Sequence, residues 1–216
     1  VRRRNLFLEA AETPGWFRYH DLIRQYLLRH FDPAPDYERT AAWFEAAADL
    51  PTAIEHALLG GLPARAAGLI AALPPDYVQQ TGKYRTLRRW VQALDAPARA
   101  AHPLILRSLA VALAEHSDRS ESFALLQEAL GYAQARGDAA VEAEIVLATA
   151  STHIAGGNAA GALDALRAID HPAQLAPALQ RKYLKRLGAV YYFLSQFHRA
   201  RRVLDQALAI STEGDE

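Results

Sequence analysis

Apolar residues recur at helical spacing along most of the chain. Between residues 36 and 211 they repeat every three or four positions, in segments separated by short breaks such as Gly137-Asp138. This periodicity predicts amphipathic α-helices, and the breaks mark their ends. We therefore expect helices near residues 36–48, 52–60, 63–73, 83–94, 104–116, 119–136, 138–155, 159–169, 175–194 and 197–211. Because the connections are short, successive helices should pack antiparallel.

The first 32 residues have a different pattern. Short apolar or aromatic runs at residues 5–8 and 16–19 flank Pro14-Gly15, which predicts a β-hairpin with a turn at the Pro-Gly pair. A helix should follow, with apolar residues at positions 22, 23, 26 and 27. The prolines at 33 and 35 disfavour helix in the residues before them, so we expect a break there.

The helical part contains weak internal repeats. The segment that starts at Leu184 resembles the tetratricopeptide pattern, with Leu187-Gly188, Tyr191, Phe197, Ala200, Leu204 and Ala207 at the matching places. Weaker copies have Ser122 and Ala162 where this segment has Ala200, at spacings of 40 and 38 residues. Small residues there would let the two helices of a hairpin approach closely, while larger ones fill the gap to the next hairpin.

These observations predict an all-α fold of antiparallel helix hairpins stacked into a tetratricopeptide-like superhelix, preceded by a small β-hairpin. Residues 36–101 should form helix hairpins without a repeat match, and residues 102–216 the degenerate repeats. Composition supports helix, because alanine is the most frequent residue and it costs least to fix in one.

Charge and composition exclude several classes of protein. Lys plus Arg and Asp plus Glu number 24 each, so the chain lacks the basic excess that drives nucleic-acid binding. It has no cysteine, no apolar run long enough to cross a bilayer and no signal-peptide core in residues 1–15. We expect a soluble, cytoplasmic protein. Because the chain begins with Val1 and contains no methionine, we expect it to be part of a longer polypeptide.

Four segments carry a resemblance to a known family. They are Asn5-Leu6-Phe7-Leu8, Trp16-Phe17-Arg18-Tyr19-His20-Asp21-Leu22, Ala42-Trp43-Phe44-Glu45 and Ala53-Ile54-Glu55-His56-Ala57-Leu58. Together they resemble the central part of MalT-like regulators, which are LuxR-type, ATP-dependent transcription activators of the STAND class. The resemblance implies that residues 1–32 end a winged-helix domain and that residues 36–216 begin a helical sensor domain. The nucleotide-binding module and the DNA-binding domain would lie outside this chain.

The resemblance also assigns a role to His20. His20-Asp21-Leu22 is similar to the Met-His-Asp motif of related winged helices, with Tyr19 in the place of Met. There the histidine contacts the β-phosphate of bound ADP and holds the closed state, so His20 would sense nucleotide in the intact protein. The alternative is a histidine that caps or packs at a strand-to-helix junction.

The sequence predicts neither catalysis nor a metal site in this chain. It lacks the G-x-x-x-x-G-K-[ST] phosphate loop, so ATP or ADP would be a cofactor of the parent protein only. We find no nucleophile elbow and no zincin helix. His153 replaces the tyrosine of the repeat pattern, and we expect it to pack against a neighbouring helix. Arg2-Arg3-Arg4 could contact DNA phosphates but is more typical of a solvated end.

The repeat register places the first helix of each hairpin on the concave surface of the superhelix. Its exposed candidates for ligand or partner binding are Arg107, Glu115, Glu144, Lys182, Lys185 and Tyr192. Such a mixture of charged and aromatic side chains could bind a small inducer or a peptide, although an ordinary wet helix face has the same composition.

Two hypotheses for function remain open. The first is a sensor segment of a MalT-like activator that binds an inducer or a protein partner and controls nucleotide-dependent transcription. In this hypothesis the intact protein self-associates, and it contacts DNA only through a domain that is absent from this chain. The second is a tetratricopeptide-like protein-interaction scaffold without a small-molecule site. We expect no membrane partner, and an enzyme ranks third.

Overall fold

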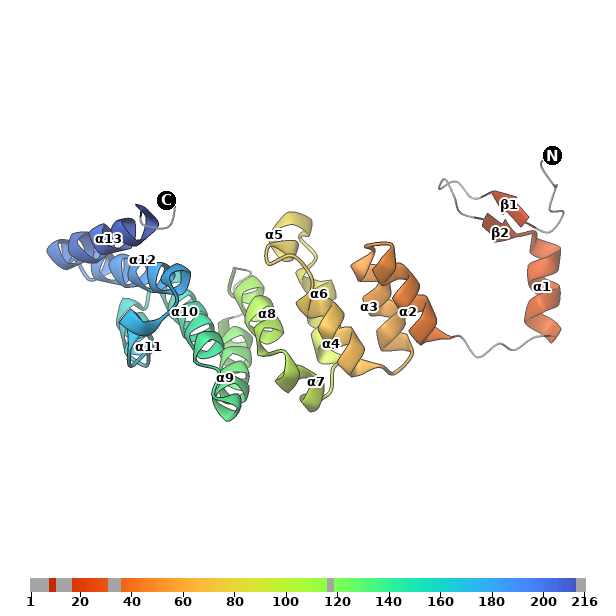
Figure 1. The fold of residues 1–216 in the computed structure, drawn as a ribbon, viewed down its shortest axis with the longest axis horizontal. Coiled ribbons are helices and arrows are strands. Elements are labelled where there is room, and N and C mark those ends of the chain that lie inside the picture. The colour runs from red at the N-terminus through yellow and green to blue at the C-terminus, as the bar shows by residue number, and fades with distance from the viewer. Residues whose placement is uncertain (1–7, 11–16, 31–35, 116–118, 213–216) are drawn as a thin grey trace. The chain divides into compact units, whose positions relative to one another are not determined.

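The computed structural model describes residues 8–10, 17–30, 36–115 and 119–212 (Figure 1). The chain divides into two compact units, Val1–Tyr37 and Glu38–Glu216. In the described part of the chain, no helix is both long enough and apolar enough for a bilayer span.

The first unit contains two short strands and one helix. Strands β1 (Leu8–Ala10) and β2 (Phe17–Tyr19) pair antiparallel, and helix α1 (Asp21–His30) follows directly. Glu9 lies opposite Arg18 in the ladder, and the Arg18 Nε lies 3.1 Å from the Glu9 Oε2. Such cross-strand ion pairs stabilise the pairing of short strands. The predicted Pro14-Gly15 turn and Arg2-Arg3-Arg4 lie outside the described residues.

The second unit is helical in its described residues. Its α-helices are α2 (Tyr37–Ala46), α3 (Leu50–Leu59), α4 (Pro63–Ala71), α5 (Tyr77–Thr81), α6 (Tyr84–Gln92), α7 (Ala96–Ala101), α8 (Pro103–Glu115), α9 (Arg119–Arg136), α10 (Ala139–Ala155), α11 (Ala159–Leu166), α12 (Pro177–Phe193) and α13 (Phe197–Thr212). The first residue of α2 falls at the boundary of the two units. A 3₁₀ turn, η1 (Pro172–Gln174), precedes α12.

The prediction omitted two short helices. Helix α5 has five residues, which is too few for a helical period to show in the sequence. Helix α7 has six residues, and the side chain of Asp95 caps it by accepting a hydrogen bond from the Ala98 N–H at 2.9 Å. The predicted helix over 175–194 begins later than expected, at Pro177, because proline is favoured in the first turn of a helix.

From α8 onward the helices pack as successive hairpins. Helix α8 packs against α9, α10 against α11, and α12 against α13; the first helices α8, α10 and α12 also contact one another in that order (Figure 1). Within these hairpins the small residues Ser122, Ala162 and Ala200 are all buried. Ser122 also links α9 to α8, because its hydroxyl donates to the Ala110 carbonyl oxygen at 2.8 Å.

The core consists of two clusters of buried side chains that meet at α10. One cluster of buried side chains extends from Ala41 to Ala148, and a second extends from Ala143 to Val190, so α10 contributes to both. Trp90 on α6 is the largest fully buried side chain, and its indole N–H donates to Glu55 of α3 at 2.7 Å. The indole therefore joins α3 and α6 without leaving its polar group unpaired.

Gly188 shows why a small residue is needed inside the last hairpin. A Cβ atom at this position would lie 2.6 Å from side-chain atoms of Leu204 on α13. We predict that Gly188→Ala destabilises the protein by about 1 kcal/mol in urea unfolding, because overpacking costs about 1–3 kcal/mol and the gain in helix propensity offsets about 1 kcal/mol. In a Leu204→Ala background, the same substitution should be neutral or stabilising. Stabilisation in both backgrounds would contradict this packing.

Candidate ligand-binding groove

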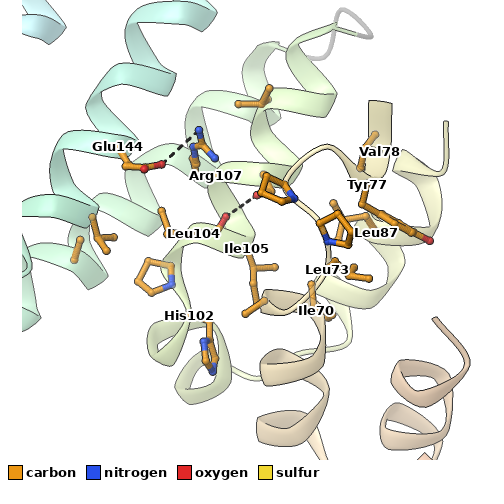
Figure 2. A pocket seen from close by; sticks show the side chains of 18 of the residues that line it. Ile70, Leu73, Tyr77, Val78, Leu87, His102, Leu104, Ile105, Arg107 and Glu144 are labelled. Carbon is orange, nitrogen blue, oxygen red and sulfur yellow. Dashed lines mark hydrogen bonds and ion pairs between the residues drawn. The ribbon is translucent and has the colours of Figure 1, made fainter. Parts of the chain in front are cut away.

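Two adjoining cavities lie along the α8, α10 and α12 layer. The larger has a volume of about 570 Å³ and also reaches α4, α5 and α6 (Figure 2). The smaller has about 360 Å³ and lies between α8, α10 and α12. The residues that line both cavities are Arg107, Val111, Glu144 and Lys182. We call the two cavities together the groove.

Helical spacing brings the polar side chains of the groove onto one face of each helix. Arg107, Val111 and Glu115 are four residues apart on α8, and Lys182 and Arg186 are four apart on α12. Residues at this spacing lie above one another on a helix surface. The contacts of α10 with α8 and with α12 then place Glu144 between them.

Glu144 connects the three helices through ion pairs. Its Oε2 lies 3.5 Å from the Arg107 Nη2 on α8, and its Oε1 lies 3.3 Å from the Lys182 Nζ on α12. The Glu144 side chain is 27% exposed and that of Arg107 is 30% exposed, so water screens these charges less than on an open surface. One carboxylate is thus shared between two cations from neighbouring hairpins.

Two guanidinium groups in the groove have unused hydrogen-bonding capacity. The Arg107 Nε is buried and has no hydrogen-bond partner. Arg186 on α12 lines the smaller cavity, and among the described residues its side chain makes no hydrogen bond or ion pair. Desolvation lowers the pKa of Arg186 from its ordinary value, but a guanidinium remains charged at neutral pH.

The larger cavity has an apolar wall. Figure 2 shows Ile70, Leu73, Val78 and Leu87 on the side opposite Arg107 and Glu144. Leu104 and Ile105 of α8 complete the wall, and Tyr77 also lines the cavity. Desolvation raises the pKa of the Tyr77 phenol, so this residue adds no negative charge at neutral pH. The groove therefore joins an apolar compartment to a charged one.

The other charged residues of the larger cavity already have protein partners. Asp138 caps α10 by accepting a hydrogen bond from the Val141 N–H at 3.1 Å. The Arg136 Nη1 donates to the Ala101 carbonyl oxygen at 2.7 Å, at the end of α7. These two side chains support helix ends, and they contribute less to the ligand-binding capacity of the groove than Arg107 does.

The predicted surface residues divide into two groups. Arg107, Glu144 and Lys182 come together as described, and Glu115 lines the smaller cavity. Lys185 and Tyr192 do not line these cavities. The ring of Tyr192 instead contacts Phe193 and Phe197, with centroid distances of 5.9 and 5.6 Å.

Arg186 and the apolar wall were not predicted from the sequence. From Lys182, a turn of 100° per residue places Arg186 about 40° to one side and Lys185 about 60° to the other. Only the position of α10 decides which side faces the groove. The sequence signal for Arg186 was its position four residues after Lys182, which places the two cations on nearly the same face of the helix. Pro and Asp are typical of helix starts, so the Pro74-Pro75-Asp76 segment could have indicated helix α5, which contributes Val78 to the wall.

His20 lies at the junction of β2 and α1 and is exposed. Its Nδ1 accepts a hydrogen bond from the Leu22 N–H at 3.4 Å, and its Nε2 lies 3.9 Å from the Glu9 Oε1. These contacts fit the local capping alternative. The phosphate contact implied by the resemblance stays a prediction.

His153 packs between helices, as expected. Its ring centroid lies 4.6 Å from that of Phe123 on α9, and its Nδ1 lies 3.3 Å from the Asn158 Nδ2. Within the described ranges, no group of three or more His, Asp or Glu side chains is placed to hold a metal ion.

The bridging role of Glu144 can be tested by stability. We predict that Glu144→Gln lowers the free energy of unfolding by about 1 kcal/mol at low salt, because Arg107 and Lys182 lose their shared carboxylate. High salt should shrink this loss. The matched control is Asp164→Asn, since Asp164 pairs with Arg167 at 2.9 Å but both side chains are largely exposed. Equal losses for the two variants in urea unfolding would contradict a stabilising bridge.

Comparison with known proteins finds a distant and partial similarity. The chain is 30% identical over 164 residues to serine/threonine-protein kinase PknK of Mycobacterium tuberculosis, in two strains, and of Mycobacterium bovis. The match covers 69% of this chain and 15% of each kinase, so the chain corresponds to a small part of these larger signalling proteins. No protein-family model and no solved structure matches the chain.

Proposed function

We propose that this chain is a sensor segment of a larger MalT-like regulatory protein, and that its groove binds the effector. The observation that carries the proposal is the groove itself, in which Glu144 connects α8 and α12 beside a cavity of about 570 Å³. Cavities of this size suit small organic ligands. Side chains from three successive hairpins line it, so a bound molecule would contact all three.

The similarity to a kinase supports a regulatory role for the shared segment. The sequence of this chain contains neither an Asp-Phe-Gly nor a His-Arg-Asp triplet, which a protein-kinase catalytic domain requires. The shared segment therefore lacks the catalytic motifs of a kinase. A helical segment that can be joined to different output domains is better suited to receiving a signal than to catalysing one particular reaction.

The hairpins are best interpreted as tetratricopeptide-like repeats. Their inner contacts use Ser122, Ala162 and Ala200, which occupy the same place in the three repeat copies and are all buried. Each hairpin shares its core with the next, as in other repeat arrays. Binding in such a groove would bias the angle between neighbouring hairpins, provided that the effector prefers one arrangement to another.

In the intact protein this bias would control nucleotide exchange. Effector binding would favour the open state, in which ADP is replaced by ATP and the protein self-associates. Transcription would then be activated through a DNA-binding domain that is separate from this chain. His20 would hold the closed state through bound ADP, and the hairpins would supply the signal that releases it.

Effector binding in the groove can be detected by thermal unfolding of the 216-residue chain. The panel contains maltooligosaccharides, common metabolites, ADP and ATP. A ligand at one hundred times its dissociation constant adds about 2.7 kcal/mol, which corresponds to a rise in Tm of about 5–10 °C for a domain of this size. We predict that one ligand class raises the Tm and that Ser108→Trp, which fills the larger cavity, abolishes the rise.

The control for this experiment is Gln206→Trp, because Gln206 is an exposed residue of α13 outside the groove. It should leave the rise in Tm unchanged. Loss of the rise in both variants, or in neither, would contradict binding in the groove. No rise across the panel would favour the alternative, a protein-interaction scaffold without a small-molecule site.

The proposed role of His20 makes a separate prediction. In the intact regulator, His20→Ala should raise activity in the absence of effector, because the closed state would lose a contact to ADP. The measurement is transcription from a reporter without inducer. His30→Ala is a suitable control, since His30 lies at the far end of the same helix. Unchanged basal activity of His20→Ala would contradict the switch role.

A further inference from the structure

The geometry of the groove points to a ligand with one anionic head group and an apolar tail. The head group would lie in the smaller cavity against Arg186 and Arg107, and the tail would extend along the apolar wall of the larger cavity. This inference rests on the proposed function, because it names the chemical class of effector that the same groove would take.

The balance of charges favours an anion. The smaller cavity is lined by the cations Arg107, Lys182 and Arg186 and by two carboxylates, Glu115 and Glu144. Glu144 is already shared between Arg107 and Lys182. The side chain of Arg186 has no ion pair among the described residues, although it is half-buried and partly desolvated. A carboxylate or phosphate would supply the missing negative charge.

The unused N–H of Arg107 points to the same chemistry. Its Nε is buried and without a partner, and an unpaired buried donor costs free energy. An oxyanion in the smaller cavity could pair with both guanidinium groups, because Arg107 and Arg186 both line it, and it would reach the Arg107 Nε only after that side chain moves. Because three cations and two carboxylates line the smaller cavity, its net charge is +1, which disfavours a cationic ligand.

The apolar wall excludes a small inorganic ion as the whole ligand. Ile70, Leu73, Val78, Leu87, Leu104 and Ile105 present hydrocarbon to the larger cavity, as Figure 2 shows. An apolar tail that removes this surface from water gains binding free energy. Val111 lines both cavities and provides an apolar path from the head group to the wall.

The test compares three probes of equal length by isothermal titration calorimetry of the 216-residue chain. They are octanoate, octan-1-ol and octylammonium, which carry a negative, a neutral and a positive head group. We expect octanoate to bind at least about tenfold more tightly than octan-1-ol, since a hydrogen bond to a charged group is worth about a factor of ten or more. Octylammonium should bind more weakly than both.

Substitution of Arg186 connects this preference to the groove. Arg186→Gln should weaken octanoate about tenfold and leave octan-1-ol unchanged, whereas Arg186→Lys, which keeps the charge, should retain most of the affinity. Arg202→Gln is the matched control, because it removes a cation from an exposed position of α13 outside the groove. Circular dichroism verifies that each variant has the helical content of the parent.

The outcomes separate the ligand class from the proposed function. Equal affinity for octanoate and octan-1-ol, no binding of octanoate, or no effect of Arg186→Gln overturns the anionic ligand. The groove as an effector site still stands if Ser108→Trp abolishes binding of octan-1-ol or of a ligand from the thermal panel. If Ser108→Trp affects none of them, the proposed function fails as well.

Discussion

Close contact between alanine-rich helix faces is the constraint on which this helical array depends. Ala110, Ala129, Ala150 and Ala162 are fully buried where helices meet. Their short side chains allow close approach, but each buries little apolar area, so an isolated hairpin would have a small core. The array solves this by sharing side chains between neighbours. Helix α10 supplies Ile145 to one cluster and Leu147 to the next.

The same helix occupies the centre of the groove. Glu144 leaves α10 on the side where α8 and α12 approach, and it pairs with one cation from each. A core that is shared between hairpins couples their positions, and the ion pairs add a polar connection at the surface. In the proposed role, a ligand that competes for these cations would act at the point where the hairpins meet. Ligand binding could in this way change the arrangement of neighbouring hairpins.

The prediction from sequence succeeded where a helix was long enough for its period to appear. The helices expected near 104–116, 119–136 and 197–211 lie within one residue of α8, α9 and α13. Helices α5 and α7 were missed because their five and six residues carry too little periodic signal. Four of the six predicted surface residues line the groove. Tyr192 and Lys185 do not. The helix register specifies which residues share a face of the helix, but it does not specify which other helix packs against that face.

Sequence alone therefore determined the helical class, the order and approximate ends of the long helices, and the small residues within the hairpins. These properties depend on local propensity and on periods of three or four residues, which one segment contains by itself. Tertiary structure decided which charges meet and which remain unpaired. Arg107, Glu144 and Lys182 are 37 and 38 residues apart. Arg186 lines the groove, whereas the adjacent cation Lys185 does not. Only the packing of α8, α10 and α12 brings these side chains to one groove, because contacts between distant segments are absent from any local pattern.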